Sequence, residues 1–133
     1  MQFKVLKQGD IMQIDLQDPM LLDSIIYAGP SGNKIKINSV KKDGNAYFFN
    51  LGNLKTQNIN YLTIFYHGKP TIAVRPPWDG GLIWAKDKNN NPFVSVACQG
   101  LGASVWYPCK DHQADEPDSA EMHITVPDTL ICV

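Results

Sequence analysis

KIKINSVKKDGNAYFFNL, residues 34–51, holds two short runs of β-branched and aromatic residues with an Asp-Gly pair between them. Residues of these types are enriched in strands, and Asp-Gly favours the positive φ angles of a tight hairpin turn. The stretch therefore predicts two antiparallel strands, Lys34–Val40 and Ala46–Leu51, joined by a turn at Asp43-Gly44.

The same pattern continues on both sides of this hairpin, where helical periodicity is almost absent and short β-rich runs alternate with turn residues such as Asn89–Pro92. It predicts an all-β fold, an antiparallel or mixed β-sandwich or a barrel-like pair of sheets. With 133 residues the chain is near the commonest size of one domain, so we expect residues 1–133 to form a single domain. The other predicted strands are Gln2–Lys7, Ile11–Leu16, Leu21–Tyr27, Tyr61–Tyr66, Leu82–Ala85, Phe93–Gln99, Ala103–Tyr107 and Glu121–Val126.

Charge and hydropathy exclude two classes of partner. The net charge is −1, from 12 basic and 13 acidic residues, and the lysines and arginines form no block. Binding to nucleic acid depends on basic groups that face phosphates, so we expect no nucleic-acid partner. The apolar runs are too short to cross a bilayer, so we expect no membrane span.

The cysteines and histidines give no metal-site pattern. The three cysteines are an odd number, which argues against a closed disulfide framework, and no pair has C-x-x-C spacing. The histidines lack the close spacing of zinc ligands. We expect two or three buried or half-buried thiols and no metal site in this chain. The residues concerned are Cys98, Cys109, Cys132, His67, His112 and His123.

No complete catalytic motif is present: the sequence lacks H-E-x-x-H, G-x-S-x-G, a P-loop and G-x-G-x-x-G. An acidic stretch near the C-terminus invites a calcium or acid–base interpretation, but its spacing does not match an EF-hand. A solvated loop is the favoured interpretation, because charged residues are mostly exposed. The acidic residues are Asp111, Asp115, Glu116 and Asp118.

The segment RPPWDGG, Arg75–Gly81, is a loop, because its two prolines exclude a central strand. Its Trp78 has two interpretations. An exposed Trp78 would be a contact residue, whereas a tryptophan that packs the loop onto a sheet is the favoured alternative, because aromatic side chains supply much of a core's buried area.

The run VSVACQGLG, residues 94–102, ends a predicted strand on a glutamine and two glycines. Strand alternation places Val94, Val96 and Cys98 on one face, which we expect to be the core side, and directs Gln99 away from it. The glycines at 100 and 102 leave the backbone bare. Gln99 is then either a polar group that meets something lying against this backbone, or a surface glutamine before a β-bulge.

Residues 93–127 resemble the aminopeptidase N and leukotriene hydrolase family of zinc metallopeptidases, in a bacterial branch. The similar pieces are Cys98-Gln99 with the small residues after it, Tyr107-Pro108-Cys109, Asp115-Glu116-Pro117 and the HITVP run at His123–Pro127. The preceding RPPWDGGLIWAKDKNNNPF is also similar to that branch. In this family the block belongs to an all-β, saddle-like N-terminal domain, and the zinc-binding motif follows in a later catalytic domain.

The resemblance implies a non-catalytic domain that forms one wall of the active-site cleft of a zinc aminopeptidase. Gln99 would hold the free α-amino group of the peptide, and Gly100 would lie along the pocket for its first side chain. The parent's zinc would sit in the downstream catalytic domain, which would be this domain's partner, and the fragment alone would be inactive.

The sequence departs from the family pattern after Pro108-Cys109. Lys110–Ala114 intervenes before the acidic motif, so either Asp111 or Asp115 is the equivalent residue. A lysine usual shortly after this motif is missing.

A second reading is a stand-alone β-sandwich module that binds carbohydrate or protein through tryptophans. Trp78, Trp84 and Trp106 would form its platform. On either reading, an exposed sheet edge or docking face would promote association, so we expect a tendency to dimerise. Localisation stays open, and export of the parent protein to the periplasm or cell envelope is one alternative.

Overall fold

The computed structural model describes residues 1–52 and 54–132, and it confirms the all-β, antiparallel fold. Within these residues, no helix is long and apolar enough to cross a membrane. The elements are β1 (Gln2–Lys4), β2 (Ile11–Asp15), β3 (Leu21–Ala28), β4 (Lys34–Ile37), β5 (Val40–Asp43), β6 (Ala46–Asn50), β7 (Ile59–His67), β8 (Gly81–Lys86), β9 (Pro92–Ala97) and the 3₁₀-helix η1 (Ala103–Val105).

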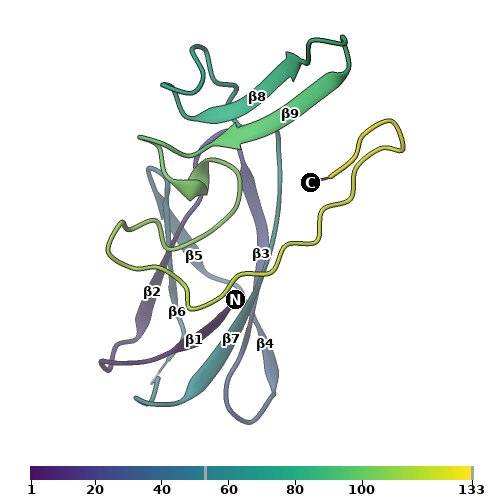
Figure 1. Ribbon diagram of the computed structural model, residues 1–133. Helices are drawn as coiled ribbons and strands as arrows, with labels where there is room; N and C mark the ends of the chain where they lie inside the picture. Colours follow the sequence, from purple (N-terminus) through teal and green to yellow (C-terminus); the bar gives the residue numbers. More distant parts are fainter. Residues whose placement is uncertain (53, 133) are drawn as a thin grey trace.

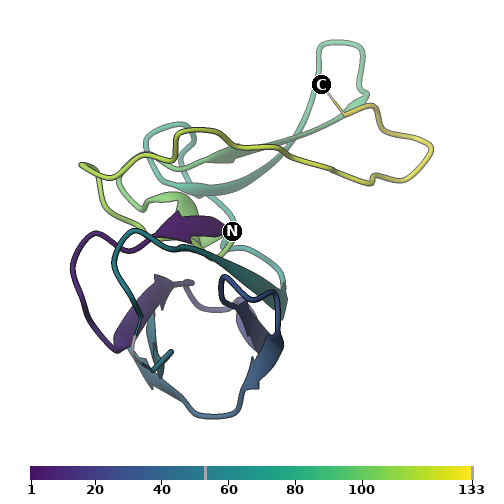
Figure 2. The same cartoon turned by 90° about the horizontal axis from the view of Figure 1, so that it is seen from below.

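The strands form three sheets. One has the order β1-β7-β3-β4, the second the order β2-β6-β5, and the third is the two-stranded ribbon β8-β9. Seen from below in Figure 2, the first two sheets surround a common interior. The ribbon lies beyond one end of them, at the top of Figure 1. The molecule is therefore a sandwich-like body with an appended ribbon.

The core lies between the first two sheets. Ile14 and Phe49 come from β2 and β6, and they pack against Ile25 and Leu62 from β3 and β7. All four are buried, and on β7 the neighbours of Leu62 in sequence, Tyr61 and Thr63, are exposed. This alternation is the period of two that lets a strand bury one face and expose the other.

The predicted hairpin at Asp43-Gly44 is present, with its turn shifted by one residue. Asp43 still pairs with Ala46, so the turn consists of Gly44 and Asn45, and Gly44 has a φ of 57°. The prediction of one strand over Lys34–Val40 is wrong. The run divides into β4 and β5, which belong to different sheets. Alternating residues do not reveal a change of partner strand, because both halves keep the same period.

The predicted turn at Asn89–Pro92 is confirmed, and it joins β8 and β9 into a hairpin. The carboxylate of Asp87 accepts backbone hydrogen bonds from Asn89 and Asn91, each of 2.8 Å. Asn90 has a positive φ of 68°, which asparagine tolerates better than most residues. The turn chemistry at Asn89–Pro92 thus closes the ribbon locally.

The ribbon does not bury the face that strand alternation assigned to the core. Val94 is exposed, and neither Val96 nor Cys98 belongs to a core cluster. Trp78, for which packing against the sheet was favoured, is 78% exposed, and Trp84 on β8 is 62% exposed. The predictions fail because the described chain places no second sheet over the ribbon, and alternation alone does not supply one.

Two predicted strands are absent from the described structure. Ala103–Tyr107 contains the 3₁₀-helix η1, and Glu121–Val126 is extended but unpaired. In the second segment Met122 and Ile124 are at least half exposed. A strand needs a hydrogen-bonded neighbour as well as alternating residues. The yellow C-terminal segment in Figure 1 has none.

Replacing Leu62 by Ala tests the core assignment. Leu62 is 2% exposed, so its truncation leaves a cavity, and we expect the free energy of unfolding to fall by about 2–5 kcal/mol. Ile59→Ala on the same strand is the matched control, because Ile59 is 46% exposed, and it should cost less than about 1 kcal/mol. Urea denaturation measures both values. Equal losses would contradict the core described above.

Candidate functional site

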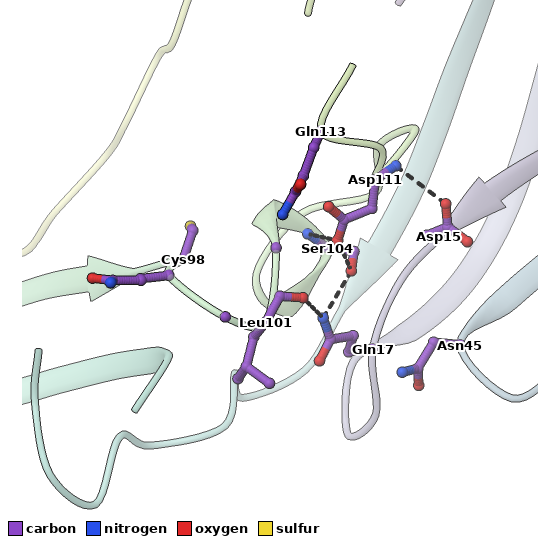
Figure 3. Close-up of a pocket in the computed structure, with 11 residues that line it drawn as sticks. Asp15, Gln17, Asn45, Cys98, Leu101, Ser104, Asp111 and Gln113 are labelled. Atoms are coloured by element: carbon purple, nitrogen blue, oxygen red, sulfur yellow. Dashed lines mark hydrogen bonds between the residues drawn. The ribbon is translucent and has the colours of Figure 1, made fainter. Parts of the chain in front are cut away.

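A polar hollow of about 650 Å³ lies where the ribbon and the C-terminal loop meet the sandwich. Figure 3 shows its lining. Three segments contribute: the end of β2 with the β5-β6 turn, the turn after β9, and the loop after η1. The lining residues are Asp15, Gln17, Asn45, Cys98, Gln99, Gly100, Leu101, Gly102, Ser104, Asp111 and Gln113.

The turn after β9 explains the two glycines. The carbonyl of Cys98 accepts hydrogen bonds from the N–H groups of Leu101 and Gly102, at 3.3 and 2.8 Å. Gly100 and Gly102 have φ values of 78° and 85°, a region that other residues rarely adopt. Gly100 faces open space, whereas a Cβ atom at Gly102 would overlap the carboxylate of Asp111. Gly102 is therefore required for both conformation and space.

Asp111 ties the loop to the 3₁₀-helix and to β2. Its carboxylate accepts hydrogen bonds from the backbone N–H and the hydroxyl of Ser104, at 3.2 and 2.6 Å. Its own N–H donates to the carboxylate of Asp15, at 3.1 Å. All four acidic residues of the loop are exposed, as the interpretation of a solvated loop expects, but Asp111 is in addition hydrogen-bonded to the rest of the protein. The carboxylate of Asp115 is paired only with Lys110 among the described contacts.

Gln17 makes a second connection to the same place. Its side-chain N–H₂ donates to the carbonyl of Leu101 at 2.6 Å and to the hydroxyl of Ser104 at 2.9 Å, as the dashed lines in Figure 3 show. Its backbone N–H donates to the carbonyl of Ser104 at 2.9 Å, and Asp15 exchanges two backbone hydrogen bonds with Cys109. The end of β2 thus holds both the turn and the loop.

The hollow is suited to cations and hydrogen-bond donors. Among its described lining residues, the charged side chains are two carboxylates, Asp15 and Asp111, with no lysine or arginine. Carbonyl oxygens of glutamine and asparagine side chains are further acceptors. No group of three His, Cys, Asp or Glu side chains able to hold a metal ion occurs within residues 1–52 and 54–132.

Both residues singled out from the sequence lie at this hollow. Gln99 and Gly100 are exposed and form part of its lining, just beyond the last residue of β9, Ala97. Sequence reasoning missed Asp15, Gln17 and Asn45, which come from segments more than 50 residues away along the chain. No local pattern marks them, because only the fold brings them to the turn.

The cysteines are free thiols, and two of them lie at or near the hollow. Cys98 and Cys109 are half-buried, as expected, whereas Cys132 is exposed. Burial raises the pKa of the Cys109 thiol to about 12, with a further contribution from the nearby carboxylates of Asp111 and Asp15. Cys109 is therefore protonated at neutral pH.

Comparison with protein-family models, with curated proteins and with solved structures finds no match to this chain. The resemblance to zinc aminopeptidases therefore rests on the motifs in residues 93–127, and its functional content is a proposal.

The three thiols should differ in reactivity. The thiolate is the nucleophile, and the raised pKa of Cys109 keeps it protonated at pH 8. We expect iodoacetamide at pH 8 to alkylate exposed Cys132 well before Cys109, as mass spectrometry of timed digests would show. Reaction of Cys109 should become faster by about tenfold with each pH unit below its raised pKa, and it should also accelerate on unfolding. Equal rates for the two residues in the folded chain would contradict this placement.

Proposed function

We propose that this chain is the non-catalytic wall of an aminopeptidase-like active-site cleft, and that Gln99 holds the α-amino group of the peptide. The observation that carries the proposal is the position of Gln99 and Gly100 at a hollow whose charged lining groups are both carboxylates. The order and spacing of the motifs in residues 93–127 support it independently.

The chemistry of the hollow fits an ammonium group. The side-chain oxygen of Gln99 is a hydrogen-bond acceptor, and an ammonium carries three donors. A neutral amide binds an ammonium less strongly than a carboxylate does. Asp15 and Asp111 supply the missing negative charge in the same hollow. Their field favours a cation at this place, while Gln99 determines where the cation is held.

Holding the amine would fix which peptide bond meets the catalytic groups, because positioning of one end of a substrate orients the rest. Those groups would come from a downstream domain. The described residues do not fit a zinc ion, since they gather no set of three ligands. On this proposal the role of the chain is to bind and orient the peptide.

The ribbon offers a surface on which such a catalytic domain would dock. Trp84 and Val94 pair across the two strands, so they share one face of the ribbon, and both are exposed. Ile72, next to Leu82 of the same face in a parallel bridge, is exposed beside them. Exposed apolar side chains that lie together mark interaction surfaces. A two-stranded ribbon is also marginally stable by itself, so a covering partner would stabilise it.

The exposure of Trp78 and Trp84 also favours the second candidate, a module that binds carbohydrate or protein through an aromatic platform. Trp106 does not join that platform. It is half-buried, and its ring meets Tyr107 edge to face at 5.1 Å. On this reading ligand binding would depend on Trp78 and Trp84, and Gln99 would be dispensable.

Replacing Gln99 by Ala tests the amine anchor in a protein that joins this domain to its catalytic domain. Loss of a hydrogen bond to a charged group costs about 1.5–3 kcal/mol, so kcat/KM for a free N-terminus should fall roughly 10- to 100-fold. An N-acetylated peptide lacks the ammonium, so its kcat/KM should change little in Gln99→Ala.

Gln8→Ala, at another exposed glutamine, is the control and should leave kcat/KM unchanged for both substrates. If Gln99→Ala lowered kcat/KM equally for free and acetylated peptides, the assignment of Gln99 as the amine anchor would be wrong.

Replacing Trp84 by Lys tests the docking surface. Because the ribbon's apolar side chains are uncovered, we expect the isolated chain to self-associate as its concentration rises, and we expect Trp84→Lys to reduce that association. Multi-angle light scattering measures the mean mass. Leu6→Lys, at an exposed apolar side chain in the loop after β1, is the control and should leave association unchanged. A strictly monomeric wild-type chain at millimolar concentration would contradict this expectation.

A further inference from the structure

We propose that Asp111 is the positioning residue for the turn that carries Gln99 and Gly100, and that it acts by fixing this turn to the end of β2. The functional half of this inference rests on the proposed role of Gln99. The structural half concerns only how the turn is held.

The turn has two possible supports, and the ribbon is the weaker one. On its N-terminal side the turn continues from β9, which pairs only with β8 among the described strands. Both ribbon strands carry exposed residues on both faces, and an isolated two-stranded ribbon is marginally stable. The ribbon therefore leaves the direction of Gln99 free to vary.

The C-terminal side of the turn is bound to the sandwich. Leu101 accepts a hydrogen bond from Gln17, and Ser104 is bonded to both Gln17 and Asp111. Ser104 is almost fully buried, so its hydroxyl needs partners inside the protein. The hydroxyl donates to Asp111 and accepts from Gln17, which fixes its orientation.

Asp111 closes this connection because it contacts both Gly102 in the turn and Ser104 in the 3₁₀-helix that follows. Its carboxylate accepts from the backbone N–H of Ser104, and it occupies the space that a Cβ atom at Gly102 would fill. Hydrogen bonds to an ionised carboxylate are stronger than those between neutral groups. Gly102 donates in turn to Cys98, so the carboxylate, the turn and the end of the ribbon form one chain of contacts.

This arrangement places an acidic residue in the binding hollow without requiring it to touch a ligand. Asp111 would set the place of Gln99 through Gly102 and Ser104, which makes it a positioning residue. Asp115, four residues later and paired with exposed Lys110, has no such connection and offers a matched comparison.

Hydrogen exchange of the whole 133-residue chain tests the structural half. In Asp111→Ala we expect the amides of Leu101 and Gly102 to exchange about tenfold faster, because Ser104, which follows the turn, loses its charged acceptor and the turn's bonds to Cys98 open more often. The amides of β3 and β7 should keep their protection. Asp111→Asn, which retains one acceptor oxygen, should lie between Asp111→Ala and wild type, and Asp115→Ala should match wild type.

Unchanged exchange at Leu101 and Gly102 in a folded Asp111→Ala chain would overturn the inference. If Asp111→Ala also loses protection in β3 and β7, Asp111→Asn takes its place, because it keeps the size of the side chain and removes its charge. Faster exchange confined to the turn in Asp111→Asn supports the inference, and wild-type exchange there overturns it.

A double-mutant cycle in the protein that joins this domain to its catalytic domain tests the functional half. Asp111→Ala should lower kcat/KM for a free N-terminus more than for an acetylated one, and it should add almost nothing in a Gln99→Ala background. If Asp111 only stabilised the fold, Asp111→Ala would lower kcat/KM for both substrates alike, and its effect would add to that of Gln99→Ala. If Gln99→Ala itself shows no selectivity, the proposed function fails, whereas the exchange result still decides how the turn is held.

Discussion

The contact of Ile14 and Phe49 with Ile25 and Leu62 is the interaction on which the rest of the structure depends. It joins the two sheets of the sandwich and fixes the direction of β2. The alternation of side chains along the strand then places the neighbouring residues. Ile14 and Leu16 face inward and are fully buried, so Asp15 and Gln17 face the other way. The residues that hold the hollow are therefore placed by the residues that form the core, one position along the same segment.

The two parts of the molecule have different physical characters. The sandwich buries apolar side chains between its sheets, whereas the ribbon presents Trp84 and Phe93 to solvent. The hollow lies at the boundary between them, and the hydrogen bonds of Gln17 and Asp111 cross that boundary. Such a site is held rigidly only on the side that the sandwich forms, and the ribbon side is less constrained. On the proposed function, a docked catalytic domain would supply the second side.

Local features were predictable from the sequence, and features that depend on a partner were not. Asp43-Gly44 and Asn89–Pro92 mark hairpins because turn conformation is decided by a few adjacent residues. Apolar and polar residues also alternate in two runs that form no strand, Ala103–Tyr107 and Glu121–Val126. Pairing with a neighbouring strand decides whether such a run becomes a strand. The turn at Gln99 was predictable from the sequence, because two glycines follow this residue. The contact between Asp15 and Asp111 joins residues 96 positions apart, and no local pattern predicts it.

The neutrality of Gln99 is easier to understand in this setting. A carboxylate at its position would add a third negative charge to a hollow that already has those of Asp15 and Asp111. Like charges that lie close together repel one another, and an empty site would bear that cost. An amide avoids it and still accepts hydrogen bonds from an ammonium. On the proposed function, attraction and placement are thus divided: the two aspartates, already hydrogen-bonded within the protein, supply a fixed field, and Gln99 supplies the contact that recognises a free amine.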